Sequence, residues 1–262
     1  MKNTTYTLIT GASSGIGKAL AYKCAERKMN LLLVALPETG LNEVADEIAE
    51  KHGIDVKTFE TDLTETNTAQ KILNWCSEKS LSVKYLINNA GVGYAELFEN
   101  VKMNFFGKLM TLNMNAVVEM THAFIPELKK QNGAGILNVS SMASHFPIPN
   151  KTVYAASKSF VFSFSRALNE ELKPYKIHVS CLCPGGTPTS EQVLERMRKG
   201  GWIHKVFSCP VVTVAEKAIS KFLKKQPVII PNTADKLVLW FSKIIPENLR
   251  IILAGKIMGM KK

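Results

Sequence analysis

Two residues able to exchange protons, Tyr154 and Lys158, lie four positions apart in the stretch VYAASKSF at residues 153–160. On a helix, residues four apart share one face, about one turn from each other. An ammonium beside a phenol stabilises the phenolate and lowers its pKa from the ordinary value of about 10. The pair is therefore either an acid–base couple or a packing coincidence, because this spacing arises by chance in many helices.

A glycine-rich turn, TGASSGIG at residues 10–17, offers a second chemical feature. Gly11, Gly15 and Gly17 would permit a tight turn, a close approach of the backbone to a pyrophosphate, and close packing of the next helix. The N-terminus of that helix would present free N–H groups to the phosphates. A plain strand-to-helix turn can carry the same glycines, but a dinucleotide site requires this position after the first strand.

The elements that must position these residues alternate along the chain. Continuous apolar runs are typical of parallel strands buried on both faces, and helical patterns separate them. We therefore expect one α/β domain over residues 1–262, a Rossmann-type doubly wound parallel sheet of about seven strands with helices on both faces. The expected strands are 6–10, 30–35, 56–62, 84–91, 135–141, 177–185 and 227–231, and the expected helices lie near 15–28, 39–52, 64–79, 103–131, 152–173 and 213–225.

The composition, 46% hydrophobic and 21% charged, is typical of a soluble globular protein. No apolar run approaches the roughly 20 residues of a membrane span, and the first residues do not resemble a secretory signal. The five cysteines are an odd number without CxxC spacing, so neither a disulfide framework nor a metal site is indicated. We expect a cytoplasmic protein.

The net charge of +11 is concentrated near the C-terminus. Residues 199–262 hold 12 Lys and Arg against 3 acidic residues, which gives 12 − 3 = +9. Such asymmetry indicates a solvated basic face, an acidic partner, a membrane surface or a nucleic acid. Aromatic residues are not interleaved as in a nucleic-acid-binding module, so we expect no nucleic acid partner.

Together these motifs resemble the classical short-chain dehydrogenase/reductase family over roughly residues 4–190. The resemblance implies an NAD(P)-dependent oxidoreductase that transfers a hydride between the nicotinamide and a carbonyl or alcohol. A non-catalytic NAD(P)-binding regulatory or scaffold protein on the same fold is the alternative. The motifs, in the family's order and spacing, are GxxxGxG at 11–17, NNAG at 88–91, SS at 140–141, YAASK at 154–158 and PGGTPT at 184–189.

By this resemblance Tyr154 is the general acid/base, and Lys158 lowers its pKa and binds the nicotinamide ribose. Ser141, thirteen residues before Tyr154, would hydrogen-bond the substrate oxygen. Ser140 is one residue off that interval, and strand alternation would point it to the opposite face.

Asn113, in TLNMNAV, matches the family asparagine that helps hold a water relaying protons to the lysine. Asn115 lies two residues further on, about 200° around a regular helix. An asparagine inside a helix is unfavourable, which makes a functional task for it plausible.

Cofactor preference depends on the end of the second strand. NAD-specific members carry an acidic residue there for the ribose 2′-OH, whereas this chain has Leu36, Pro37 and then Glu38, with Ser14 in the glycine turn. The missing carboxylate favours NADP(H) over NAD(H), although Glu38 could still reach a 2′-OH. The resemblance implies cofactor binding by Gly11, Ser13, Ser14, Gly15, Ile16, Gly17, Asp62, Leu63, Asn89, Ala90, Gly91, Tyr154, Lys158, Pro184, Gly185, Thr187 and Thr189.

The family's variable substrate lid corresponds to about residues 190–210. Its apolar residues, with Phe146 and Ile148, suggest a lipophilic ketone or alcohol, such as a 3-oxoacyl chain or a steroid-like ring, or they simply pack the lid. Its basic residues could meet an anionic tail or be solvated. The apolar ones are Met197, Trp202, Ile203, Val206 and Phe207, and the basic ones are Arg196, Arg198 and Lys199.

The basic extension at 232–262 has no counterpart in the resemblance. Trp240 and Phe241 with their basic flanks could meet a membrane surface or an acidic carrier protein, or could pack on the body or a second subunit. The helices at 103–131 and 152–173 are the family's usual dimer contacts, so we expect a homodimer or homotetramer.

Overall fold

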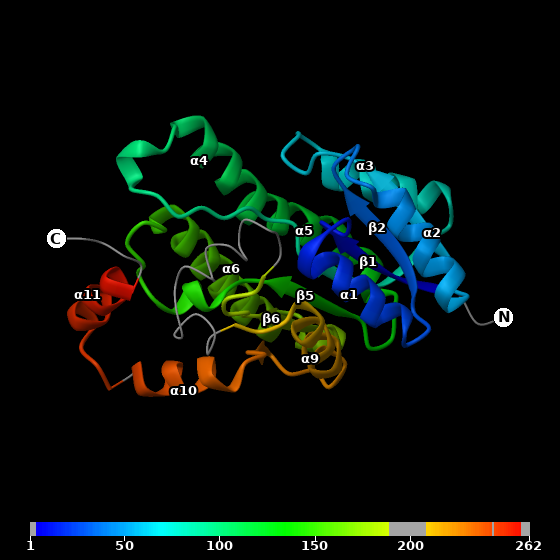
Figure 1. Cartoon of the computed structure of the whole chain (residues 1–262). Helices are drawn as coiled ribbons and strands as arrows, with labels where there is room; N and C mark the ends of the chain where they lie inside the picture. The colour runs from blue at the N-terminus through cyan, green and yellow to red at the C-terminus, as the bar shows by residue number, and fades with distance from the viewer. Residues whose placement is uncertain (1–3, 189–207, 243, 258–262) are drawn as a thin grey trace.

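A computed structural model describes residues 4–188, 208–242 and 244–257 of the chain. Within these residues the expected architecture is confirmed, because all seven strands join one parallel sheet in the order β3-β2-β1-β4-β5-β6-β7 (Figure 1). The residues expected to form most of the lid lie outside the described part, as does Thr189. The lid residues concerned are Arg196, Met197, Arg198, Lys199, Trp202, Ile203, Val206 and Phe207.

The strands are short and lie close to their predicted positions. β2 has the predicted bounds, whereas the strands predicted at 84–91 and 177–185 end earlier because their last residues form loops. The strands are β1 (Thr5–Thr10), β2 (Asn30–Ala35), β3 (Val56–Glu60), β4 (Ser82–Asn88), β5 (Gly135–Val139), β6 (His178–Leu182) and β7 (Val228–Ile229).

The helices differ from prediction chiefly at 103–131, where one continuous helix was expected. A π turn, η2 (Thr111–Asn115), separates α4 from α5 there. The helices are α1 (Gly15–Ala25), α2 (Leu41–His52), α3 (Thr68–Glu78), α4 (Met103–Met110), α5 (Ala116–Lys129), α6 (Thr152–Glu171), α9 (Val211–Leu223), α10 (Thr233–Ser242) and α11 (Glu247–Ile257), with 3-10 turns at Phe98–Asn100, Met142–His145 and Lys173–Tyr175.

Apolar side chains cover both faces of the sheet, which explains the continuous apolar runs. Along β2, Leu31 and Leu33 face α1, α2 and α9, whereas Leu32 and Val34 face α3, α5 and α6. The residues that form the two clusters are buried, as a sheet between two helical layers requires. The strand ends that emerge between the layers are therefore held firmly.

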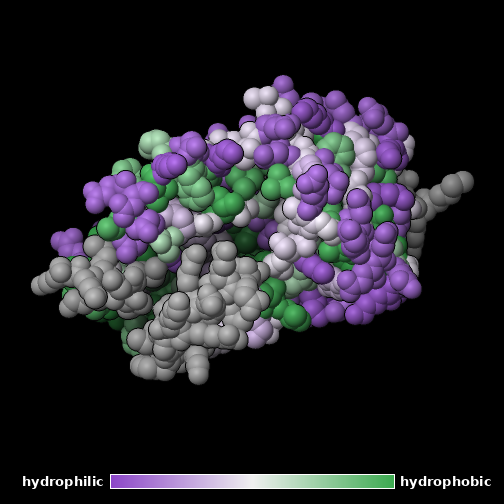
Figure 2. Space-filling view, turned by 45° about the horizontal axis from the view of Figure 1, so that its top comes forward, coloured by the Kyte–Doolittle hydropathy of each residue, from purple (hydrophilic) through white to green (hydrophobic). Residues whose placement is uncertain are grey.

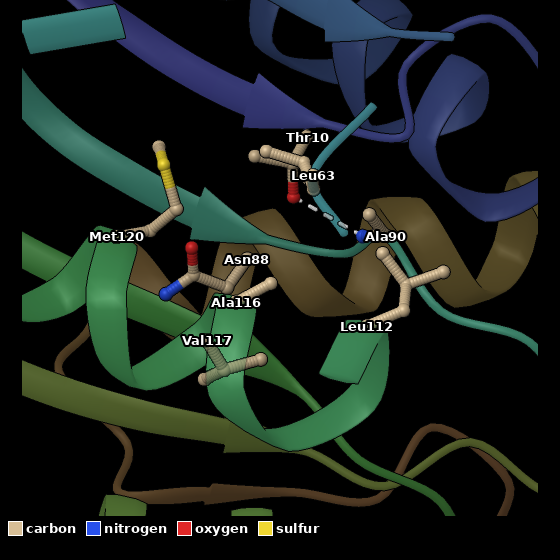
Figure 3. Close-up of a pocket in the computed structure, with 8 residues that line it drawn as sticks. All are labelled: Thr10, Leu63, Asn88, Ala90, Leu112, Ala116, Val117 and Met120. Carbon is tan, nitrogen blue, oxygen red and sulfur yellow. Dashed lines mark hydrogen bonds between the residues drawn. The ribbon is translucent and has the colours of Figure 1, made fainter. Parts of the chain in front are cut away.

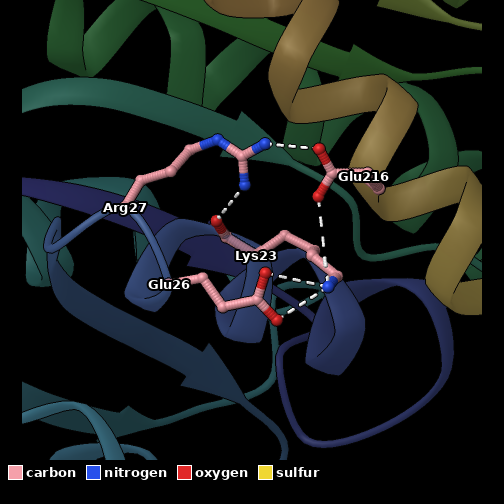
Figure 4. Close-up of polar contacts among 4 residues, drawn as sticks. All are labelled: Lys23, Glu26, Arg27 and Glu216. Carbon is pink, nitrogen blue, oxygen red and sulfur yellow. Dashed lines mark hydrogen bonds and ion pairs between the residues drawn. The ribbon is translucent and has the colours of Figure 1, made fainter.

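The helix after the glycine turn is tied to α9 by charged side chains (Figure 4). Arg27, two residues past the end of α1, contacts Glu216 of α9 at 2.5 Å, and Lys23 of α1 lies 4.0 Å from the same carboxylate. Pairs this exposed add little stability, about 0–1 kcal/mol each. They do show that α9, far along the chain, packs beside α1. No helix in the described part of the chain is both long and apolar enough to cross a bilayer.

Candidate active site

The predicted site residues gather at one edge of the sheet, the carboxyl ends of β1, β4, β5 and β6, which we call the site edge. The chain goes from β1 to β2 on one side, while β4 pairs with β1 on the other. Such a reversal of strand order is where open α/β sheets bind ligands. Figure 2 shows a face of the molecule that is hollowed near its middle, with apolar side chains gathered along the upper rim of the hollow.

The turn after β1 has the backbone conformation that its glycines suggested. Gly11 and Gly15 have φ values of +65° and +53°, a region that favours glycine. A Cβ on Gly17 would lie 2.0 Å from the Gly11 carbonyl oxygen, so any side chain there would push the helix off the turn. Ser14 begins α1 with an exposed hydroxyl that makes no cap hydrogen bond. Ser13 and Ile16 lie half-buried in the same turn.

The segment after β4 braces this turn. The Asn89 side chain donates to the carbonyl oxygens of Thr10, at 2.9 Å, and Gly11, at 3.1 Å. The Thr10 hydroxyl accepts from the backbone N–H groups of Asn89 and Ala90, and Figure 3 shows the bond from Ala90. Sequence reasoning missed Thr10; its signal was a polar residue ending a buried strand. These bonds fix the glycine turn in the shape that phosphates would need.

Leu63 and Ala90 line a small space beside the end of β1, together with Leu112 (Figure 3). It leaves no room for a water molecule. Nearby, Asp62 follows β3 by two residues, and its Oδ1 accepts from the backbone N–H and hydroxyl of Thr64, each at 2.8 Å. Asp62 therefore shapes the turn before α3, and its contact with adenine stays a prediction.

Tyr154 and Lys158 are close neighbours on α6. The Lys158 Nζ lies 5.9 Å from the centre of the Tyr154 ring and donates to the Val139 carbonyl oxygen at 3.0 Å. Burial lowers the pKa of Lys158 to about 8. Its ammonium is thus held at the end of β5, beside the phenol.

The direction of the Tyr154 pKa shift differs from our expectation. Burial raises the pKa of Tyr154 above its usual value, while the neighbouring Ser141 hydroxyl opposes the shift. Lys158 directs its ammonium at a carbonyl instead of the phenol oxygen. The phenol is therefore protonated at neutral pH, as a proton donor must be.

Ser141 lies two residues beyond β5, not within the strand as predicted, and it precedes the 3-10 turn Met142–His145. Its Oγ accepts from the Ala143 N–H at 3.1 Å. Ser140 is buried and donates its hydroxyl to the Lys158 carbonyl oxygen at 2.7 Å. The two serines thus have separate tasks, and only Ser141 neighbours the Tyr154 hydroxyl.

Asn113 occupies the π turn and is fully buried, whereas Asn115 is exposed. The Asn113 side-chain amide accepts from the Val92 N–H and donates to the Val92 carbonyl oxygen, both at 2.9 Å. It also donates to the Ser157 hydroxyl at 3.1 Å. Asn113 therefore joins the segment after β4 to α6, and π turns are frequent at functional sites.

Two glycines keep the centre of the site open. A Cβ on Gly91 would lie 2.9 Å from the Asn113 Oδ1 and 3.3 Å from the Lys158 Nζ. A Cβ on Gly93 would lie 3.3 Å from the Tyr154 ring. Gly91 was predicted, but Gly93 was missed, because a single glycine in a loop gives no signal of its neighbour.

The loop after β6 completes the site edge. The Pro184 carbonyl oxygen accepts from the Met142 N–H at 2.9 Å, which joins this loop to the one carrying Ser141. Thr187 is buried, and its hydroxyl donates to the Gly185 carbonyl oxygen at 3.2 Å. A Cβ on Gly185 would lie 2.2 Å from Oδ2 of Asp235, a buried carboxylate on α10. Helix α10 therefore packs directly on the predicted cofactor loop.

This constellation defines a dinucleotide-binding oxidoreductase site. The glycine turn packs so closely that a Cβ on Gly11 or Gly17 would clash with neighbouring atoms, and a buried ammonium lies beside a protonated phenol. The short chain dehydrogenase model matches residues 5–199, and the chain belongs to that family.

A very-long-chain 3-oxoacyl-CoA reductase of Bos taurus is 33% identical over 201 residues, which cover 75% of this chain and 63% of the relative. The chain thus spans less than two thirds of the length of that curated relative. A solved short-chain dehydrogenase from Sphingobium yanoikuyae in complex with NADPH is 27% identical with a TM-score of 0.77, covering 93% of this chain and 97% of that one.

The fold is also that of a structure reported for 7beta-hydroxysteroid dehydrogenase stereoselectivity. Its TM-score is 0.86 at 22% identity, with 95% of this chain and 96% of that one covered.

Proposed function

We propose that this protein is an NADP(H)-dependent reductase of lipophilic ketones, with 3-oxoacyl thioesters as the first candidate substrates. The observation that carries the proposal is the cluster of Tyr154, Lys158, Ser141 and Asn113 beside the glycine turn. A scaffold protein would have no need of all four, and nothing in the site favours that alternative.

The chemistry assigned to the residues is reduction of a carbonyl. When bound, the reduced nicotinamide supplies the hydride that adds to the carbonyl carbon. Ser141 donates a hydrogen bond to the carbonyl oxygen, and Tyr154 transfers its proton to the developing alkoxide. Lys158 holds positive charge near the phenol and would bind the ribose, while Asn113 positions α6 through Ser157. The raised pKa of Tyr154 supports the reductive direction.

The substrate class rests on two observations. The Bos taurus relative is described as a very-long-chain 3-oxoacyl-CoA reductase, and apolar side chains gather along the upper rim of the hollow in Figure 2. Phe146 and Ile148, half-buried after the Ser141 turn, would extend such an apolar surface toward a long chain.

The preference for NADP(H) rests on Leu36, which directly follows β2 and is half exposed. An acidic residue at this position would repel a 2′-phosphate, and Leu36 is uncharged. The relative solved with NADPH supports this assignment. In Leu36→Asp, we expect kcat/KM with NADPH to fall at least tenfold relative to NADH, whereas the uncharged Leu36→Asn should change the ratio much less.

We further propose a homo-oligomer in the cytoplasm. Exposed Met103 on α4 and Phe160 on α6 lie on the helices that the family uses for dimer contacts. All five cysteines are buried free thiols, which suits a reducing compartment. Light scattering of the purified protein tests the assembly.

The decisive experiment measures NADPH oxidation with 3-oxoacyl-CoA substrates of increasing chain length, alongside steroid and small ketones. Tyr154→Phe should lower kcat about 10²–10⁴-fold and leave NADPH binding, followed by its fluorescence, nearly intact. Tyr175→Phe, at an exposed tyrosine after the same helix, is the matched control. A Tyr154→Phe protein that keeps most of its rate would contradict the assigned role, and absence of NADPH and NADH binding would contradict the function.

A further inference from the structure

The apolar stripe of α10 faces away from the protein. Leu237, Trp240 and Phe241 follow the i, i+3, i+4 spacing of one helix face and are 55%, 60% and 55% exposed, and Ile244, just past the end of the helix, is 72% exposed. The opposite side carries the contacts with the body, because Asp235 and Ser242 are buried and Leu239 packs on the cluster of Cys181, Cys183 and Ile230. The helix is thus docked by its less apolar side.

The next helix also carries an exposed apolar face. On α11, Leu249, Ile252 and Leu253 share one face by the same spacing and are all exposed. Trp240 and Phe241 meet edge to face, with ring centres 4.8 Å apart. An apolar surface this extensive on one segment marks an interaction site. We call α10 and α11 the C-terminal pair.

Uncompensated positive charge lies beside this surface. Lys217 and Lys221 on α9 lie near Lys236 on α10, and burial together with these two neighbouring ammonium groups lowers the pKa of Lys221. No carboxylate of the described residues lies within 4 Å of the three lysines. Lys236 precedes Trp240 by four residues, so charge and aromatic ring share one side of α10.

We propose that the C-terminal pair is a peripheral binding surface for anionic lipid bilayers. The apolar stripe would enter the boundary between headgroups and acyl chains, and the lysines would meet lipid phosphates. The charge complementarity favours this occupant over a second copy of the chain, because a two-fold contact through the same face would bring the uncompensated lysines of both copies into one interface.

The proposal is independent of the catalytic assignment. It describes a surface on which the protein lies, since no helix of the described residues is suited to span a bilayer. Its chemistry is that of an amphipathic interfacial helix, with aromatic and aliphatic residues flanked by lysine.

Vesicle sedimentation tests the proposal. The full chain is mixed with vesicles of phosphatidylcholine alone or with 30% phosphatidylglycerol, at low and high salt. We expect at least tenfold stronger partitioning to the anionic vesicles, weakened by salt. The double variants Trp240→Ser/Phe241→Ser and Lys221→Glu/Lys236→Glu should each lower it at least tenfold. Val212→Ser, at an exposed apolar residue on α9, should not.

Thermal unfolding and NADPH fluorescence confirm that each variant is folded, since none of these residues belongs to the site edge. Light scattering runs in parallel. Sedimentation with neither vesicle, or sedimentation that the variants leave unchanged, overturns the proposal. So does a Trp240→Ser/Phe241→Ser protein that becomes monomeric while its vesicle binding is unaltered, because the face would then join copies of the chain.

Discussion

The site edge and the C-terminal pair differ in which groups they bury and which they expose. At the site edge, polar side chains such as Asn113 and Lys158 are buried and bound to backbone groups. In the C-terminal pair, aromatic side chains such as Trp240 are exposed and the helix is held by one side. The difference teaches that a buried polar group is held in place by its hydrogen bonds, whereas an exposed apolar face is available to bind a partner.

The largest expected effect is the loss of stability and of NADPH binding when Gly17 is replaced. In Gly17→Ala the new Cβ would lie 2.0 Å from the Gly11 carbonyl oxygen, a backbone atom that cannot move alone. We expect a loss of stability of more than about 3 kcal/mol and at least 100-fold weaker NADPH binding, measured by denaturant unfolding and fluorescence titration. Gly107→Ala, within α4 and with open space around it, should instead stabilise by roughly 0.5–1 kcal/mol. Equal effects at the two glycines would contradict this prediction.

The burial of Asp235, at the contact between α10 and the site edge, predicts that the stability of the protein depends on pH. Burial raises the pKa of this carboxyl from 3.8 to about 6, and its Oδ2 has no hydrogen-bond partner. Because the folded state holds the proton more tightly, the stabilising contribution is complete below about pH 3.8 and is lost as the pH rises through about 6. The shift corresponds to up to about 3 kcal/mol.

The test compares unfolding free energies of the wild type and Asp235→Asn between pH 4 and pH 8. Their difference should change by up to about 3 kcal/mol in favour of the variant over that range. Glu247→Gln, which removes an exposed acid on α11, is the matched control for the loss of a negative charge. A constant difference for Asp235→Asn would mean that its carboxyl titrates normally.

A smaller loss is expected at Asn113. Its removal in Asn113→Ala leaves the Val92 and Ser157 groups without their partner and should cost about 2 kcal/mol. The exposed Asn115→Ala should remain within about 0.5 kcal/mol. Denaturant unfolding measures both. Similar costs for the two asparagines would show that burial in the π turn does not separate them.

The smallest effect on stability is expected in the C-terminal pair. Trp240→Ser removes a large side chain that is mostly exposed, so the unfolding free energy should change by no more than about 0.5 kcal/mol. Turnover should also stay at the wild-type level. A loss of several kcal/mol would show that the ring is covered in solution.

The sequence allowed the fold to be predicted because its strongest signals are local. The runs YTLIT and NLLLVA could be buried only between two helical layers, and the glycine turn marked the first strand end. Tyr154, Lys158 and Ser141 were located by spacing, and the structure brings them together.

Other features depend on contacts between distant residues and leave no local pattern. The π turn follows from the buried bonds of Asn113 to Val92 and Ser157, which the helical pattern of 103–131 does not contain. The packing of Asp235 on Gly185 joins residues 50 positions apart. The pKa of Tyr154 follows from burial, and burial is a property of the assembled site.

The π turn makes chain length a determinant of catalysis in its own right. It accommodates one more residue than a regular α-helix would hold between α4 and α5. Deleting a single residue from 111–115 would let the segment wind as an uninterrupted helix, and the bulge that directs the Asn113 amide at Val92 and Ser157 would be lost. Such a deletion would spoil the site while leaving Tyr154, Lys158 and Ser141 in place. A related chain can therefore keep the equivalents of Tyr154, Lys158 and Ser141 and still lose its activity because one residue of this turn is deleted.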